Sequence, residues 1–266
     1  MLNLLLMIKI VLAVTMVIGL ARIAEKVGPD WAGVLSGFPL GIALVLFFYG
    51  IEQGTAYASQ AAYSGLLGLA CSLGFVVIYA QTSRLFHERS WFPMGLALFG
   101  FYGLASFALK LPYIAGWGAL FAVVAAWIAS RLLHPLLEPS FRAVNPKWWM
   151  FWGRAVLAAL LVVIVTSLAN WLSPEWAGML ASFPLTLFSL MLLLQLSYGT
   201  GPPMVLAKHF PYGVGSLIVY TIAVAKLYPL IGVALGTALA FALAGIYLLG
   251  FAYWRRYRHK IGRRRH

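Results

Sequence analysis

The chain has 266 residues, of which 63% are hydrophobic and 9% are charged, and its mean hydropathy is +0.91. Soluble domains are typically about a quarter charged, so this chain has too few charged side chains to cover a water-facing surface of its size. The composition excludes a soluble enzyme, a nucleic-acid-binding module and a disordered chain as descriptions of the whole protein. It predicts an all-α, polytopic transmembrane helix bundle.

Nine apolar runs are each long enough, at about 20 residues, to cross a bilayer as a helix. The first run has neither a preceding basic segment nor a small-residue cleavage site, so we expect a retained transmembrane helix rather than a signal peptide. The nine predicted spans cover residues 3–24, 33–51, 59–80, 92–109, 112–133, 154–172, 178–197, 207–226 and 228–253.

The distribution of basic residues predicts how the spans are oriented. Only Lys110, Leu111 and Pro112 separate the fourth and fifth runs, so one long kinked helix is an alternative there. If nine spans alternate and the C-terminus is cytoplasmic, 16 of the 19 Lys and Arg residues lie on the cytoplasmic side. Lys9, Lys110 and Lys226 then lie outside. Because basic loops favour the cytoplasm, we expect nine spans with the N-terminus out and the C-terminus in.

The net charge of +13 is concentrated near the end of the chain, where seven basic residues lie between Arg255 and Arg265. A basic cluster beside a span commonly anchors topology and meets anionic lipid head groups. We therefore expect residues 254–266 to be a cytoplasmic tail that contacts the lipid bilayer, and we expect no nucleic acid partner. The single cysteine, Cys71, excludes an internal disulfide.

A motif recurs without a gap at an offset of 145 residues. Residues 28–55 read GPDWAGVLSGFPLGIALVLFFYGIEQGT, and residues 173–200 read SPEWAGMLASFPLTLFSLMLLLQLSYGT. Five spans separate equivalent points, and an odd number reverses the direction of crossing. We therefore expect two inverted four-helix repeats, in residues 1–110 and 151–253, joined by a linker helix and a cytoplasmic loop in residues 111–150.

Each copy of the motif contains a helix-breaking sequence inside a predicted span. A proline in a helix removes one hydrogen bond and clashes with the preceding turn, and small residues precede both prolines. Paired interruptions of this kind point to the binding site of secondary transporters, and a proline kink at a packing interface is the alternative. The residues that we expect to bind substrate are Ser36, Gly37, Phe38, Pro39, Ser182, Phe183, Pro184 and Thr186.

Three carboxylates are candidates for ion or proton coupling. Asp30 and Glu175 each precede an apolar helix, where a carboxylate also caps the helix and complements its dipole. Glu52 has no acidic counterpart, because Ser197 occupies the equivalent position, and solvation in a loop is the alternative for it. We expect Lys9, near the outer interface, to extend its amine toward water.

Signatures of enzymes, metal sites and cofactors are absent from the sequence. The five histidines are scattered, and no phosphate-binding G-x-x-x-x-G-K-[ST] motif occurs. We expect no catalytic residue, no metal and no cofactor. The leading hypothesis is a secondary transporter or exporter of a small molecule that works by alternating access. A non-transporting accessory protein for cell-envelope polysaccharide or lipid assembly is the alternative, and a homodimer is possible in either case.

The string A-G-x-L-x-x-F-P-L, followed by Gly50 and Glu52, resembles the core of the small GlpM-type bacterial inner-membrane proteins. Those are four-span proteins of roughly half this length, so the chain resembles two such units fused in opposite orientation. The resemblance implies a multi-pass protein of the bacterial cytoplasmic (inner) membrane with a link to exopolysaccharide production. The matching residues are Ala32, Gly33, Phe38, Pro39, Gly50 and Glu52, then Ala177, Gly178, Phe183 and Pro184, whereas Gln195 and Ser197 depart from the pattern.

Overall fold

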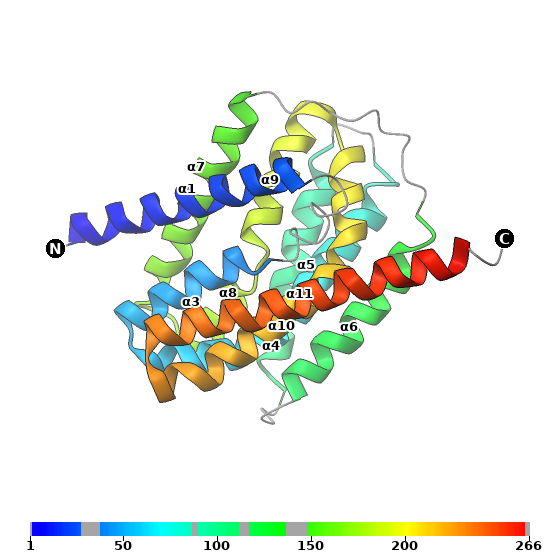
Figure 1. The fold of residues 1–266 in the computed structure, drawn as a ribbon. Helices are drawn as coiled ribbons and strands as arrows, with labels where there is room; N and C mark the ends of the chain where they lie inside the picture. Colours follow the sequence, from blue (N-terminus) through cyan, green and yellow to red (C-terminus); the bar gives the residue numbers. More distant parts are fainter. Residues whose placement is uncertain (1, 28–37, 87–89, 112–116, 137–147, 264–266) are drawn as a thin grey trace.

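The computed structural model describes residues 2–27, 38–86, 90–111, 117–136 and 148–263, and this part of the chain contains ten helices and no strand (Figure 1). The helices are α1 (Leu2–Val27), α3 (Leu40–Glu52), α4 (Thr55–Thr82), α5 (Phe92–Ala108), α6 (Trp117–Leu133), α7 (Trp148–Leu168), α8 (Pro174–Ala181), α9 (Leu185–Tyr198), α10 (Gly201–Ile231) and α11 (Val233–Arg263). The expected all-α class is confirmed. Helices α5 and α6 are separate, so the alternative of one long kinked helix across the fourth and fifth runs is wrong.

Several helices are apolar and long enough to cross a membrane. Among the described residues these are α4, α10 and the Val233–Phe251 part of α11, and α8 with α9 adds a fourth if the bent pair counts as one span. The apolar helices α3, α5 and α6 are shorter, at 13, 17 and 17 residues. A helix of 20 residues spans about 30 Å, the thickness of the hydrocarbon core.

Helix α4 forms the centre of the bundle and packs against α3, α5, α6, α8 and α10. Two thirds (67%) of its most apolar window is buried, against 22% in α11. A helix that is apolar on all sides is suited to this central position. The largest buried side chains of the core include Tyr79 and Phe75 from α4.

The other helices also pack against one another. Helix α3 contacts α4, α9 contacts α10, α4 contacts α5, and α10 contacts α11. Helix α1 packs against α7, and α4 packs against α10. Figure 1 shows the α1 and α7 pair at one side of the molecule and the adjacent α10 and α11 at another.

The outer faces of α5, α6 and α11 carry large apolar side chains. Phe99, Val123 and Ile246 are 75%, 53% and 66% exposed, and each has apolar neighbours on the same face. Soluble monomers rarely expose continuous apolar surfaces of this kind. These faces are suited to contact with lipid chains.

Candidate functional site

The predicted break in the second motif lies where the sequence places it. Helix α8 ends at Ala181, α9 begins at Leu185, and the two helices are bent by 47° at this point. Pro184 cannot donate a helical hydrogen bond, and its backbone leaves the helical region with φ −76° and ψ 67°. Ser182, Phe183 and Pro184 therefore form the non-helical link.

A hydroxyl of α4 binds one backbone group that the break frees. The Ser72 hydroxyl of α4 donates to the Ser182 carbonyl oxygen at 2.7 Å. The Ser182 hydroxyl donates to the Gly65 carbonyl oxygen at 2.6 Å and also lies 3.0 Å from the Gly178 carbonyl oxygen. Irregular backbone at membrane depth is tolerated only where protein or water supplies such partners. Ser72 is thus part of the site, although the sequence indicates it only as one hydroxyl among several in the spans.

Small residues bring α4 and α8 into backbone contact beside the break. Ala61, Gly65, Gly68 and Ser72 are spaced three or four residues apart, so they share one face of α4. A Cβ atom at Gly178 would overlap the Ala61 carbonyl oxygen, and one at Gly68 would lie 3.0 Å from the Met179 Cα. Small residues permit this close approach between membrane helices, and the approach places Ser72 within reach of Ser182.

Phe183, in the middle of the break, packs against three other aromatic rings. The Phe183 ring lies 5.3 Å from the Phe75 ring, 5.0 Å from the Phe101 ring and 5.3 Å from the Phe188 ring, measured between centroids. The contacts with Phe75 and Phe101 are edge-to-face, the geometry that aromatic quadrupoles favour. We call Phe75, Phe101, Phe183 and Phe188 the phenylalanine cluster. It covers Phe183 with rings from α4, α5 and α9.

The first motif is described only in part. Ser36 and Gly37, expected in the substrate site, and Asp30, a coupling candidate, lie outside the described residues. Pro39 directly precedes α3, with φ −78° and ψ 41°, as Pro184 directly precedes α9. Each Phe-Pro pair therefore stands at the start of a short apolar helix.

The two Phe-Pro pairs have different surroundings, but the helices that follow them are in contact. Phe38 stacks on Phe241 of α11 at 5.3 Å and is not part of the phenylalanine cluster. A Cβ atom at Gly41 would lie 3.7 Å from Thr186 Cγ2 and 3.8 Å from Leu185 Cβ. The first turns of α3 and α9 are therefore in contact, and Thr186 lies at that contact.

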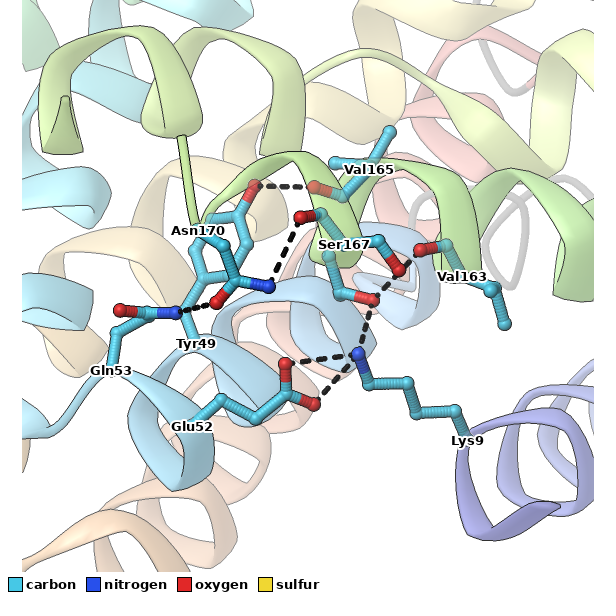
Figure 2. A network of polar contacts seen from close by, with 9 residues as sticks. Lys9, Tyr49, Glu52, Gln53, Val163, Val165, Ser167 and Asn170 are labelled. Carbon is cyan, nitrogen blue, oxygen red and sulfur yellow. Dashed lines mark hydrogen bonds and ion pairs between the residues drawn. The ribbon is translucent and has the colours of Figure 1, made fainter. Parts of the chain in front are cut away.

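A second polar group joins α1, α3 and α7 (Figure 2). The Lys9 ammonium lies 2.7 Å and 3.0 Å from the two carboxylate oxygens of Glu52 and donates to the Thr166 hydroxyl at 2.8 Å. It also lies 5.7 Å from the centre of the Phe48 ring. The side chains of Lys9 and Glu52 are only 5% and 14% exposed.

This arrangement corrects two expectations. Lys9 does not extend its amine to water, and Glu52 is not solvated in a loop, because each neutralises the other inside the bundle. The physical reason is that an isolated buried charge is costly, and a counter-charge with further hydrogen bonds offsets that cost. Hydropathy could not indicate the pairing, because 43 residues separate the two side chains.

Further hydrogen bonds attach the end of α3 and the start of α4 to their neighbours. The Tyr49 hydroxyl lies 3.2 Å from the Ala177 carbonyl oxygen. The Gln53 amide donates to Asn170 at 2.6 Å (Figure 2). Gln60 of α4 donates to Glu175 at 2.6 Å. The coupling candidate Glu175 therefore lies in an exposed contact, separate from Glu52.

The comparisons with known proteins give no match: no protein-family model, no characterised protein and no solved structure is similar to the chain at a significant level. Within the described ranges, no group of three or more His, Cys, Asp and Glu side chains could hold a metal ion.

Proposed function

We propose that the protein is a secondary transporter or exporter of a small molecule, with its substrate site near the two Phe-Pro breaks. The proposal includes nine spans in two inverted repeats, an external N-terminus and a cytoplasmic C-terminus. It rests chiefly on one observation: the short helices that begin after Pro39 and Pro184 contact each other through Gly41 and Thr186.

The contact between the first turns of α3 and α9 is chemically suited to bind a substrate. The first turn of each helix has backbone N–H groups without helical partners and carries the positive end of the helix dipole. Transporters with inverted repeats form their sites from such interrupted spans. Alternating access here means that α3 and α9 move relative to α4 and α10, which opens the phenylalanine cluster toward one side at a time.

The paired packing of the helices supports the repeat. If α1, α3, α4 and α5 correspond to α7, α9, α10 and α11, then α1 against α7 and α4 against α10 are contacts between equivalent helices. Such self-equivalent contacts are expected around a twofold axis. Helix α6 has no counterpart in this scheme and is the proposed linker.

Location in a bacterial inner membrane follows from the GlpM-type resemblance and remains part of the proposal. The basic tail supports a cytoplasmic C-terminus beside anionic lipid. Coupling through Glu52 requires a state in which the Lys9 pair is broken, for example by protonation of the carboxylate. Asp30 and Glu175 are the weaker coupling candidates.

Flux measurements test the proposal. A thermal-stabilisation screen on the purified chain first identifies a ligand, and uptake of that labelled ligand into proteoliposomes is then measured. We expect Pro39→Ala and Pro184→Ala to reduce flux severalfold, because each restores a helical hydrogen bond at a break. Pro229→Ala is the matched control, since Pro229 is exposed inside α10 and outside the motif. Unchanged flux in both motif variants would remove the proposed site.

One observation favours the alternative, a non-transporting accessory protein for cell-envelope polysaccharide or lipid assembly. The break at Ser182–Pro184 is closed by Ser72 and by the phenylalanine cluster, as expected for a purely structural bend. This alternative predicts a stoichiometric partner protein in mild-detergent purification and no flux after reconstitution.

A further inference from the structure

The buried ion pair has an incomplete counterpart in the second half of the chain. Extending the offset of 145 residues to the preceding helix aligns Lys9-Ile-Val-Leu-Ala13 with Arg154-Ala-Val-Leu-Ala158. A cation followed by the same Val-Leu-Ala therefore recurs at the equivalent place in α7. The same offset aligns Glu52 with Ser197. The second half keeps the positive charge and lacks the carboxylate.

Helix α7 packs on α9 near Arg154, as α1 packs on α3 near Lys9. Lys9 lies over Phe48, one turn before Glu52. A Cβ atom at Gly153, beside Arg154, would lie 3.5 Å from Leu193 Cδ1. Leu193 is the counterpart of Phe48, and residues four apart share a helix face, so Ser197 follows Leu193 as Glu52 follows Phe48.

Arg154 of α7 and Ser197 of α9 each have a buried polar atom without a hydrogen-bond partner, Nε and Oγ respectively. The third member of the first group, Thr166, has Ala21 as its counterpart, so that hydroxyl is missing too. The two carboxylates whose side chains the structure describes are engaged elsewhere, Glu52 with Lys9 and Glu175 with Gln60.

We propose that Arg154 and Ser197 form an oxyanion-binding site, in which a carboxylate or phosphate group of a ligand takes the place of the missing glutamate. A guanidinium binds such groups through two parallel hydrogen bonds, and leaving its buried Nε without an acceptor is costly. Arg154 is twelve residues from Thr166 along α7, so the site is about 18 Å from the Lys9 pair. The oxyanion is either a soluble anion or the phosphate of an anionic lipid head group.

This inference uses the same repeat alignment as the proposed function but requires no transport, so it is tested by binding alone. The full chain is placed in phosphatidylcholine nanodiscs, and its melting temperature is measured in inorganic phosphate and in chloride at equal ionic strength. In a second arm, phosphatidylglycerol is added to the nanodisc lipid without phosphate in the buffer. We expect a saturable rise of about 3 °C in at least one arm, and its absence in Arg154→Gln.

The two arms identify the source of the oxyanion. A response to phosphate alone assigns a soluble anion, and a response to phosphatidylglycerol alone assigns a lipid head group. Equal responses of the wild type and Arg154→Gln in both arms, or no response in either arm, would overturn the proposal.

Two further variants keep the test decisive if Arg154→Gln does not fold. Ser197→Glu supplies the missing carboxylate, so we expect a higher melting temperature in chloride and no further rise with either oxyanion. Glu52→Ser removes the carboxylate beside Lys9, so we expect phosphate to raise the melting temperature of this variant more than that of the wild type. A full oxyanion response in Ser197→Glu would contradict the assignment of the site.

Discussion

Buried charge dominates the chemistry of this molecule at the scale of single residues. Lys9 is 4% exposed, and its ammonium group is held by Glu52 and Thr166 from two other helices. Removing one member of a buried pair leaves the other charge without compensation, which costs more than the pair itself contributes. Arg154 differs from Lys9, because no described side chain accepts a hydrogen bond from its buried Nε.

We expect Glu52→Gln to lower the free energy of unfolding by about 3 kcal/mol, because the Lys9 charge stays buried without its counter-charge. Thermal unfolding in one detergent measures the change, and the double variant Lys9→Met/Glu52→Gln should recover most of it. Glu175→Gln is the matched control, since its contact with Gln60 is exposed and should contribute less than about 1 kcal/mol. Equal losses of unfolding free energy in Glu52→Gln and Glu175→Gln would show that burial does not make the Lys9–Glu52 pair more important than an exposed contact.

At the scale of helices, the bend between α8 and α9 depends on how closely α4 approaches. The Ser72 hydroxyl reaches the Ser182 carbonyl oxygen because Gly65, Gly68 and Gly178 leave no side chain between the two helices. The proline alone accounts for the end of α8. The neighbouring helix supplies the hydroxyl that binds the Ser182 carbonyl oxygen in the break.

Gly178→Ala should therefore destabilise the protein, because its methyl group would overlap the Ala61 carbonyl oxygen and push α8 away from α4. We expect a loss of about 2 kcal/mol, typical of overpacking. Gly245→Ala is the matched control: nothing lies within 4 Å of its added Cβ, and alanine favours a helix by about 1 kcal/mol over glycine. Thermal unfolding of both variants in the same detergent tests this, and equal melting temperatures would exclude tight packing at Gly178.

At the scale of the whole molecule, the proposed architecture is a pair of halves related by an axis in the membrane plane. The contacts of α1 with α7 and of α4 with α10 join the halves. A pair of opposed motifs offers two equivalent gates, which is why inverted repeats suit alternating access.

Cysteine labelling tests the opposed orientation directly. Cys71 is the single cysteine, so Cys71→Ser provides a background without thiols. We expect Glu175→Cys to react with a membrane-impermeant maleimide from outside the cell. Asp30→Cys and Leu85→Cys should react only after the membrane is permeabilised, and Leu85 is 80% exposed, so its accessibility is not limited by packing. Labelling of Asp30→Cys and Glu175→Cys from the same side would exclude inverted repeats.

The helices themselves could largely be predicted from hydropathy. The predicted run 92–109 corresponds to α5 at Phe92–Ala108, but the run 207–226 is shorter than α10 at Gly201–Ile231. Pro202 and Pro203 begin α10, where proline is favourable, and Pro211 and Pro229 lie inside the helix without ending it. Hydropathy therefore locates the centre of a helix better than its ends.

The candidate site could also be predicted only in part. Composition and proline chemistry act locally, so the residues alone predict the apolar helical class, the recurring motif and the break before Pro184. The contacts of Lys9 with Glu52 and Thr166, and of Ser72 with Ser182, depend on how distant segments pack. Helices that are apolar on every side have no periodicity to indicate which face meets which neighbour, so close packing between distant segments makes that choice.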